Sequence, residues 1–290
     1  MTFSILQAVY KNDSPIFFNE CLSSIKDSTI QPAKIILVKD GTIPAELESV
    51  ISEWQNNLPL QVVGYEQNQG LAHALNFGLQ FVDTDLVARM DSDDYCFPER
   101  FEKQLAYFRS YPEVEILGTG ISEFYLNEDG NVFRKNRFYP QYSNNSSKKL
   151  FKGTPLGHPT VMMKSELLKN FRYSENTNMN EDIDLWFRLI RGGHTLYNLE
   201  ESLLNFRITD GTFKRRSIKK AFSEFKIYWK NLYALFGFSP LLVYPIARLC
   251  IRFLPYGINK KLYFSNMRKK FFKQDVNTTC GVGEESILLP

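Results

Sequence analysis

The sequence predicts an α/β protein in which helices cover both faces of a mainly parallel sheet. Through residues 1–213, short apolar runs alternate with segments whose apolar residues recur at helical spacing. Several of the apolar runs end in polar or acidic clusters. Alternating strands and helices are typical of parallel sheets, which bind ligands beyond the carboxyl ends of their strands. These observations therefore predict a ligand site along one edge of the sheet.

The first elements follow from apolar spacing. Phe3–Val9 is a short, mostly apolar run and predicts a buried strand. Pro15–Thr29 has apolar residues at every third or fourth position, which predicts a helix. Lys34–Val38 predicts a second buried strand, closed by an Asp-Gly pair. A helix is expected from Pro44 to about residue 57, because proline is favoured in a first helical turn.

The next elements repeat the alternation. Leu60–Tyr65 predicts a third strand, and Leu71–Phe81 predicts a helix after an Asn-Gln-Gly turn. Leu86–Met90 predicts a fourth strand that runs directly into the acidic cluster Asp91-Ser92-Asp93-Asp94. The cluster is therefore expected at the ligand-binding edge of the sheet.

The acidic cluster is the clearest chemical signal in the sequence. Acidic turns are common on protein surfaces, but three crowded carboxylates repel one another unless a cation neutralises them. Mg²⁺ and Mn²⁺ prefer oxygen ligands and usually share their coordination shell with substrate phosphates. Asp91 and Asp93, as a D-x-D at a strand end, therefore predict a metal–diphosphate site.

These features together resemble the family 2 glycosyltransferases, which have the GT-A fold and use nucleotide-diphosphate sugars. The nearest subgroup makes bacterial capsule, exopolysaccharide and O-antigen chains, including amylovoran-type transferases. Six stretches in the family's order carry the resemblance: Ser4–Tyr10 (SILQAVY), Ile35–Gly41 (IILVKDG), Asn68–Gly78 (NQGLAHALNFG), Ala88–Arg100 (ARMDSDDYCFPER), Gly157–Met162 (GHPTVM) and Asn180–Arg188 (NEDIDLWFR). They span residues 2 to about 208.

The resemblance implies roles for the nucleotide side of the site. The expected nucleotide-binding residues are Ala8, Val9 and Tyr10 in the base pocket, Asp40 on the base, Asn68, Gly70 and Arg89 near the nucleotide, and Asp91 near the ribose. Asp93 is expected to bind the Mn²⁺ or Mg²⁺ cofactor that bridges the diphosphate. Lys11 and Asn12 stand where the family commonly has one asparagine, so their contacts are left open.

The resemblance also implies roles on the acceptor side. Asp182 matches the family's catalytic base, and Asp94, His158 and Glu181 are expected to face the donor sugar or the acceptor. Elementary chemistry agrees, because an attacking hydroxyl needs a base and a departing diphosphate needs charge stabilisation. Attack on the face opposite the leaving group would invert the anomeric centre. Acidic residues in a first turn also stabilise a helix, so Glu181 and Asp182 can serve structure as well.

The carboxyl-terminal part differs in charge. Residues 1–213 carry a net charge of −8, whereas residues 214–273 carry +14. Within Ser217–Phe236 an apolar stripe recurs at helical spacing: Ile218, Phe222, Phe225, Trp229, Leu232 and Phe236. Prolines and arginines within Leu235–Pro255 argue against a membrane span, and a second basic, aromatic segment is Lys260–Lys273. The alternatives are binding to an anionic membrane surface or packing on the catalytic domain.

These patterns define an expected organisation and location. Residues 1–213 are expected to form the catalytic domain, with a nucleotide-sugar half at about 1–100 and an acceptor half at about 101–213. Residues 214–290 are expected to form a helical, membrane-associating region. The amino-terminal residues lack a basic, apolar leader, and the four cysteines lack metal or disulfide spacing, so a cytoplasmic protein on the inner face of the membrane is expected.

The expected function is inverting transfer of a sugar, most simply from a UDP-sugar, to a growing bacterial surface polysaccharide on an undecaprenyl-diphosphate lipid. The alternatives are a sugar-nucleotide pyrophosphorylase and an inactive membrane-bound scaffold with the same fold. A pyrophosphorylase needs a glycine-rich loop after the first strand, and residues 10–15 contain no glycine. The same absence argues against a dinucleotide-binding dehydrogenase. No nucleic-acid recognition motif accompanies the basic segment, so no nucleic-acid partner is expected.

Overall fold

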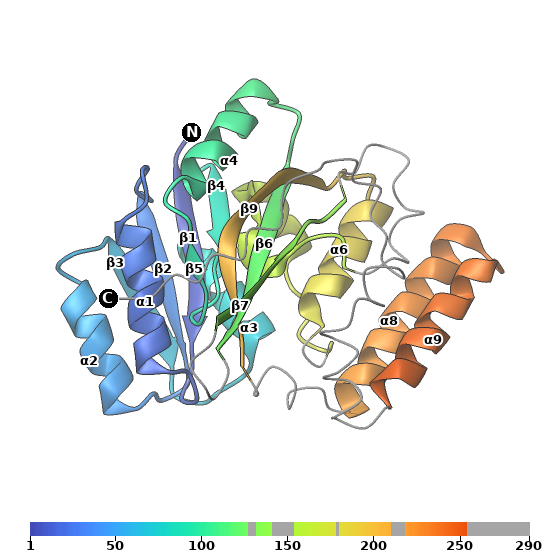
Figure 1. The fold of residues 1–290 in the computed structure, drawn as a ribbon, viewed down its shortest axis with the longest axis horizontal. Coiled ribbons are helices and arrows are strands. Elements are labelled where there is room, and N and C mark those ends of the chain that lie inside the picture. Colours follow the sequence, from blue (N-terminus) through green and yellow to red (C-terminus); the bar gives the residue numbers. More distant parts are fainter. Residues whose placement is uncertain (127–131, 141–153, 178–179, 210–217, 254–290) are drawn as a thin grey trace.

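A mixed sheet forms the centre of the computed structural model, which describes residues 1–126, 132–140, 154–177, 180–209 and 218–253 (Figure 1). The strand order is β3-β2-β1-β4-β8-β6-β9-β5, and β7 pairs with β6. The strands are β1 (Phe3–Val9), β2 (Lys34–Asp40), β3 (Leu60–Tyr65), β4 (Leu86–Arg89), β5 (Tyr95–Cys96), β6 (Ile116–Leu126), β7 (Val132–Arg137), β8 (Met162–Lys164) and β9 (Tyr197–Ile208). The α-helices are α1 (Pro15–Lys26), α2 (Ala45–Trp54), α3 (Leu71–Gly78), α4 (Arg100–Ser110), α5 (Ser165–Phe171), α6 (Glu181–Arg191), α8 (Ile218–Phe236) and α9 (Val243–Arg252).

The predicted α/β fold class and parallel half of the sheet are confirmed. β1 pairs in parallel with β2 and β4, and β2 pairs in parallel with β3. The predicted bounds of β1 and β3 match the structure, and β2 extends to Asp40. The helix expected over Leu71–Phe81 changes after α3 into a short 3₁₀ helix at Leu79–Phe81. Because these strands run the same way, their carboxyl ends lie at one edge.

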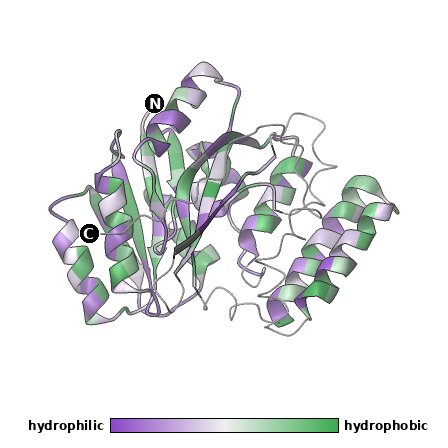
Figure 2. Ribbon diagram, in the orientation of Figure 1, coloured by the Kyte–Doolittle hydropathy of each residue, from purple (hydrophilic) through white to green (hydrophobic). Residues whose placement is uncertain are grey.

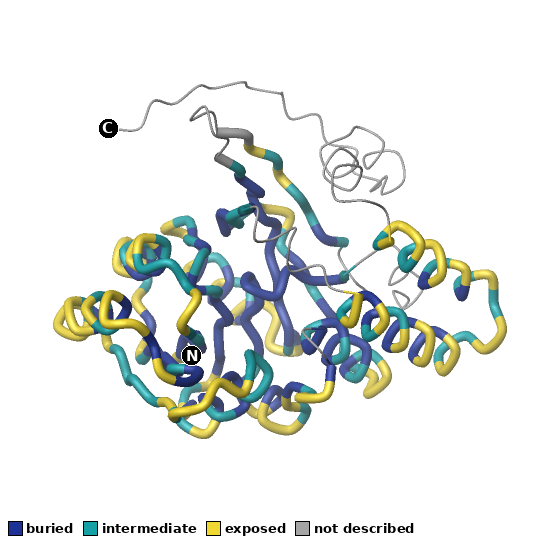
Figure 3. Tube along the Cα trace, turned by 90° about the horizontal axis from the view of Figure 1, so that it is seen from below, coloured by how far each residue is buried: buried dark blue, intermediate teal, exposed yellow. Residues whose placement is uncertain are grey.

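Helices cover both faces of this sheet, as its buried strands require. One hydrophobic cluster joins the strands to α1, α2 and α4, and a second joins them to α3, α5 and α6. Along β1, Ile5 points into the first cluster and Leu6 into the second, as strand alternation dictates. Figure 3 shows the strands as the most buried part of the chain.

The second half of the sheet mixes strand directions. β8 runs antiparallel to both β4 and β6, and β9 runs parallel to β6. The short strand β5, which follows the acidic cluster, pairs antiparallel with the end of β9. This pairing brings residues near 205–207 to the cluster at residues 91–94.

The carboxyl-terminal helices α8 and α9 form a hairpin that lies against α6 (Figure 1). Ile183 and Phe187 of α6 pack with Ile227, Tyr228 and Leu232 of α8 in a third hydrophobic cluster. The packing alternative from the sequence is therefore confirmed for α8. The predicted division at residue 213 falls outside the described residues and stays a prediction.

Only part of the apolar stripe predicted on α8 packs against the protein. Among its members, Leu232 is buried, whereas Ile218, Phe222 and Trp229 are exposed. Hydrophobic and hydrophilic residues alternate along both helices of the hairpin (Figure 2). No helix in the described part of the chain has the length and apolar character needed to cross a bilayer. Lys260–Lys273 lies outside the described residues.

Candidate active site

Three aspartates converge directly after β4. Asp91, Asp93 and Asp94 each place a carboxylate oxygen within 4.8 Å of the others. Asp94 is buried, and its Oδ2 has no hydrogen-bond partner among the described residues. Burial raises the pKa of Asp94, and the charges of Asp93 and Asp91 raise it further. A buried carboxylate oxygen without a donor, beside two more carboxylates, fits a hard divalent cation.

Arg207 on β9 holds this acidic segment in place. Its main-chain N–H donates to Asp94 Oδ1 at 2.9 Å, and its Nε donates to the main-chain carbonyl of Asp93 at 3.0 Å. Its guanidinium also pairs with Glu20 and lies 4.0 Å from the ring centroid of Phe17 on α1. The arginine therefore ties the acidic segment to both β9 and α1.

Asp91 is anchored by residues of β4, β1 and α1. Arg89, which is buried on β4, forms an ion pair with its carboxylate. The main-chain carbonyl of Asp91 accepts hydrogen bonds from Gln7 Nε2 and Cys21 Sγ, both at 3.3 Å. Since its backbone is fixed, the Asp91 carboxylate has little freedom to leave the cluster.

Asp40 organises the turn before α3. Its Oδ1 accepts from the hydroxyl of Tyr65 at 2.9 Å and the main-chain N–H of Gln69 at 2.8 Å. Its Oδ2 accepts from Asn68 Nδ2 at 2.8 Å and the main-chain N–H of Gly70 at 3.0 Å. These bonds bring together Asp40, Asn68 and Gly70, three of the residues that the sequence predicts near the nucleotide. Protein donors therefore occupy both oxygens of the Asp40 carboxylate. A contact between Asp40 and the nucleotide base stays a prediction.

Gly41 allows this close approach. Its φ is +86°, a left-handed conformation that favours glycine. A Cβ at this position would lie 2.7 Å from the main-chain nitrogen of Asn68. Residue 41 therefore must lack a side chain for β2 and the Asn68 turn to meet.

At the end of β1, the main chain is more available to the candidate site than the side chains are. Val9 is buried in the hydrophobic core, so its main chain is the part that can reach a nucleotide. Ala8 and Tyr10 are half-buried. The main-chain N–H of Tyr10 donates to Asp13 Oδ2 at 3.1 Å, and Ser92 Oγ donates to the same oxygen at 2.9 Å. Asp13 thus joins the end of β1 to the acidic segment.

His158 is a packing residue as well as a candidate ligand contact. Its Nε2 lies 3.0 Å from the hydroxyl of Tyr173, and its ring packs edge-on against Tyr173 and Trp186. Burial lowers the pKa of His158, and the charge of Arg89 lowers it further. The imidazole is therefore held neutral, and contact with the donor or acceptor stays a prediction.

Glu181 and Asp182 begin α6, as the sequence predicted. Glu181 is buried, and Asp182 is half-buried. Burial, together with the charge of Asp182, raises the pKa of Glu181 to about 7. Burial also raises the pKa of Asp182. A carboxylate with a raised pKa is a better proton acceptor, which suits general-base catalysis.

Residues 158–161 connect the end of β4 to α6. The main-chain N–H of Arg89 donates to the carbonyl of Val161 at 2.7 Å, and the ring of His158 packs against Tyr173 and against Trp186 of α6. Burial raises the pKa of the Tyr173 hydroxyl, and the charges of Glu181, Asp182 and Asp91 add to that effect while Arg89 opposes it. The end of β4 and the helix that carries the acidic pair are therefore joined through one set of contacts.

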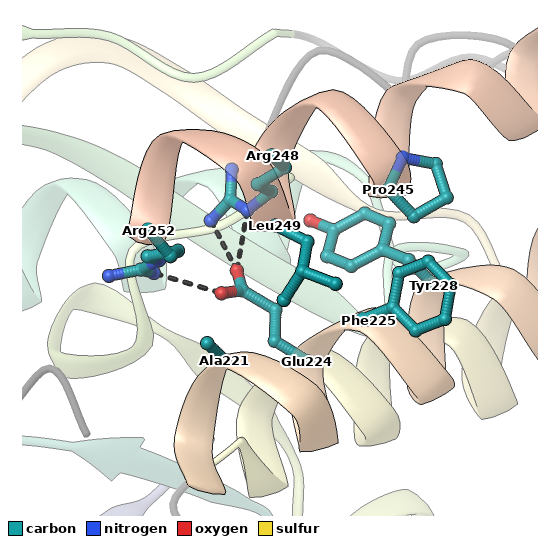
Figure 4. A pocket seen from close by; sticks show the side chains of 8 residues that line it. All are labelled: Ala221, Glu224, Phe225, Tyr228, Pro245, Arg248, Leu249 and Arg252. Atoms are coloured by element: carbon teal, nitrogen blue, oxygen red, sulfur yellow. Dashed lines mark hydrogen bonds and ion pairs between the residues drawn. The ribbon is translucent and has the colours of Figure 1, made fainter. Parts of the chain in front are cut away.

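The hairpin α8–α9 contacts the start of α6, where Glu181 and Asp182 lie. Asn180 Nδ2 donates to the main-chain carbonyl of Lys220 at 3.1 Å. One turn further along α8, Glu224 is buried between Arg248 and Arg252, which donate to its carboxylate at 2.6 and 2.9 Å (Figure 4). This ion cluster fixes α9 on α8.

Comparison with known proteins identifies the architecture around these carboxylates. The family model for "Glycosyl transferase family 2" matches residues 8–171, which include the end of β1, Asp40 and the acidic cluster. The chain belongs to glycosyl transferase family 2. This membership confirms the resemblance seen in the sequence and favours glycosyl transfer over a pyrophosphorylase activity.

Relatives within family 2 match nearly the whole chain. An uncharacterized glycosyltransferase of Haemophilus influenzae is 37% identical over 93% of this chain and 100% of its own length. The amylovoran biosynthesis glycosyltransferase AmsE of Erwinia amylovora is 36% identical over 90% of this chain and 97% of its own length. An Escherichia coli protein named UDP-Gal:alpha-D-GlcNAc-diphosphoundecaprenol beta-1,3-galactosyltransferase is 35% identical over 92% of this chain and 97% of its own length.

Solved structures confirm the GT-A fold of this family 2 member. S. aureus TarS 1–349 in complex with UDP-GlcNAc superposes with a TM-score of 0.64 at 16% identity, over 93% of this chain and 75% of that chain. The mannosyltransferase PcManGT from Pyrobaculum calidifontis, in complex with GDP-Man and Mn²⁺, gives a TM-score of 0.60 at 13% identity, over 93% of this chain and 83% of that chain.

Sequence reasoning missed several residues of the site in this family 2 enzyme. Arg207 and Tyr173 carry no local motif, and Arg207 lies 113 positions from Asp94 along the chain. Asp13 stands in the polar segment after β1, where no motif distinguishes it from its neighbours. Pairing of β5 with β9 is what brings Arg207 to the cluster, and no spacing rule within one segment encodes that pairing.

Proposed function

We propose that this glycosyltransferase transfers a sugar, with inversion, from a nucleotide-diphosphate donor to a hydroxyl of a lipid-linked glycan in polysaccharide biosynthesis. The observation that carries the proposal is a pair of acidic groups, one after β4 and one at the start of α6, on elements that residues 158–161 connect by direct contacts. One is the cluster of Asp91, Asp93 and Asp94, and the other is the pair Glu181 and Asp182. A glycosyl transfer needs charge stabilisation on one side of the sugar and a base on the other.

The donor diphosphate is expected at the acidic cluster. Asp93, with Asp91 and Asp94, would hold Mn²⁺ or Mg²⁺, and the buried Oδ2 of Asp94 supplies an oxygen for it. When bound there, such a cation would stabilise the negative charge that gathers on the leaving diphosphate. Arg89 and Arg207 keep the carboxylates in position. Mn²⁺ in the complex of PcManGT supports this assignment.

Asp182 is the proposed base. It would take the proton of the acceptor hydroxyl as that oxygen attacks the anomeric carbon, while the bond from the carbon to the diphosphate oxygen breaks. A single displacement of this kind inverts the anomeric centre and needs no covalent sugar–enzyme intermediate. Asn180 and the start of α8 hold the helix terminus that carries Asp182. Glu181 and His158 are the proposed contacts to the sugars.

The relatives support a proposed donor class and a proposed acceptor class. A uridine nucleotide is proposed because TarS binds UDP-GlcNAc and the Escherichia coli relative is named for UDP-Gal. The name of the same relative points to a sugar on diphosphoundecaprenol as the acceptor. A membrane-embedded acceptor requires an enzyme that works at the bilayer surface. The exposed apolar residues of α8, with its lysines, support peripheral attachment to the inner face of the cell membrane.

Turnover and product analysis test the proposal. The full chain is incubated with Mn²⁺, a panel of UDP-, GDP- and dTDP-sugars, and acceptors that carry one sugar on a lipid diphosphate. We expect transfer from a UDP-sugar, with a new glycosidic bond of opposite anomeric configuration by nuclear magnetic resonance. Retained configuration would refute inversion. Donor binding without any turnover across the panel would support the scaffold alternative instead.

A further inference from the structure

A groove runs along α8 on the side away from Glu224. It has a volume of about 420 Å³ and lies between α8 and the segment that precedes α6. Its lining includes Thr177, Ile218, Lys219, Phe222, Ser223 and Lys226. None of these residues belongs to the donor site described above.

Thr177 in the groove wall lies five residues before Asp182, the proposed base, in the sequence. Ser223 Oγ donates to the main-chain carbonyl of Thr177. Asn180, three residues further on, donates from Nδ2 to the carbonyl of Lys220. Asp182 follows within the next turn. A ligand seated in the groove would therefore have one end close to the start of α6.

The groove presents positive charge beside apolar surface. Lys219 and Lys226 are seven residues apart, so they lie on one face of α8 about 10 Å apart along its axis. Both are exposed, and neither forms a salt bridge within the part of the chain that the structure describes. Ile218 is 62% exposed and Phe222 is 44% exposed, beside these lysines.

The two sides of α8 therefore differ. On the α9 side, Arg248 and Arg252 are neutralised by Glu224. On the groove side, two ammonium groups flank two solvent-facing apolar side chains. Large apolar side chains that face water favour an apolar partner that covers them. The complementary ligand has an anionic group joined to an apolar chain.

We propose that this groove binds the lipid-diphosphate end of the acceptor. Lys219 and Lys226 contact the diphosphate, and Ile218 and Phe222 contact the first isoprene units of the lipid. The sugar on the diphosphate then extends towards Asp182. The proposal rests on the proposed function, since it assumes a lipid-linked acceptor, and it adds the residues that recognise the part of the acceptor that is not sugar.

Binding of farnesyl diphosphate to the full chain tests this groove. Titration is done in EDTA, so that the acidic cluster cannot take the diphosphate through a metal ion. We expect farnesyl diphosphate to bind at least about tenfold more tightly than farnesol or inorganic diphosphate, because both halves of the ligand contribute. The double variant Lys219→Glu/Lys226→Glu should bind it at least about tenfold more weakly.

Lys230→Glu is the matched control, because Lys230 is an exposed lysine on the same helix outside the groove. It should bind farnesyl diphosphate like the wild type. Phe222→Ser gives a second, charge-neutral variant, which should lose affinity for farnesyl diphosphate while its weak affinity for inorganic diphosphate is unchanged. Circular dichroism verifies that each variant is folded.

Three results would overturn the proposal. One is equal loss of farnesyl diphosphate binding in the double variant and in Lys230→Glu. Another is equal affinity for inorganic and farnesyl diphosphate. The third is a double variant that keeps farnesyl diphosphate binding and loses only binding to phosphatidylglycerol vesicles, which would assign the lysines to the membrane surface. UDP and Mn²⁺ titration of the same variants reports separately on the donor site, so failure of the groove is distinguishable from failure of the proposed function.

Discussion

The main-chain N–H of Arg207 donates a 2.9 Å hydrogen bond to Asp94 Oδ1, which joins the end of β9 to the acidic segment after β4. The side chain of Arg207 adds a bond to the carbonyl of Asp93 and an ion pair with Glu20. The carboxylates at the proposed metal site are thus oriented by a strand from the other half of the sheet.

Arg207→Ala should weaken Mn²⁺-dependent UDP binding by about tenfold, as loss of an outer-shell contact typically does. The main-chain bond to Asp94 remains, so binding should be reduced and not abolished. Isothermal titration of UDP at fixed Mn²⁺ measures the effect. Arg134→Ala is the control, because Arg134 lies on the same sheet and bonds Asn205 instead. Equal losses in both variants would show that the effect is general destabilisation.

Asp93→Asn should remove metal-dependent UDP binding, lowering the affinity measured with Mn²⁺ by at least about 100-fold. Asparagine keeps the size of the side chain and loses the charge that a divalent cation requires. Asp83→Asn makes the same change at an exposed position and should bind normally. Unchanged affinity in Asp93→Asn would remove this residue from the metal site.

Asp182→Asn should keep donor binding and lose about 10²–10⁴-fold in the rate of sugar transfer, the usual contribution of a general base. The rate of transfer and the Kd of UDP are measured on the same preparation. Asp184→Asn is the matched control on α6, since Asp184 forms an ion pair with Arg188 at 2.7 Å within the same helix. Near-normal transfer by Asp182→Asn would eliminate it as the base.

Glu181 makes stability fall as pH rises. Its pKa is raised from 4.5 to about 7 in the folded protein, so the folded state holds a proton that the unfolded state has released between these values. The free energy of unfolding therefore decreases across this window, by as much as about 3 kcal/mol once pH exceeds 7. Glu181→Gln should flatten the decrease between pH 5 and pH 8 in urea titrations. A variant with the same pH slope as wild type would contradict the raised pKa.

The exposed apolar surface of α8 should attach the enzyme to anionic membranes. Trp229→Ser/Tyr233→Ser removes two of its exposed aromatic side chains, which are 37% and 46% exposed. Affinity for phosphatidylglycerol vesicles, measured by co-sedimentation, should fall by about 30-fold, since each of the two rings contributes on the order of 1 kcal/mol when it inserts. Wild-type binding should also weaken as salt screens the lysines.

Tyr111→Ser controls for general loss of an exposed aromatic residue, because Tyr111 is 47% exposed at the end of α4. Its sedimentation should match wild type. Point variants are preferable to deleting the carboxyl-terminal region, because α8 covers Ile183 and Phe187 and a deletion would expose them. A wild-type protein that stays in the supernatant at low salt would exclude membrane attachment through this surface.

Much of the fold could be predicted from the sequence because its signals are local. Apolar runs such as Phe3–Val9 must be buried on both sides, and helical spacing between them leaves one architecture. The acidic cluster was recognisable for the same reason, since three carboxylates in four residues at a strand end imply a cation. The orientation of α8 was not predictable, because both of its faces carry apolar residues and only contact with α6 decides which one is buried.

By itself the sequence determined the α/β class, the family, the acidic cluster and the acidic start of α6, because each is written in contiguous residues. Only the tertiary structure decided that Arg207 supports the cluster, that the Asn68–Gly70 turn donates to both carboxylate oxygens of Asp40, and that Ile218, Phe222 and Trp229 of the predicted α8 stripe face outward. Those relationships depend on strand pairing and helix packing between segments that are distant in the sequence. The contacts that stabilise them cannot be predicted from the residues of either segment alone.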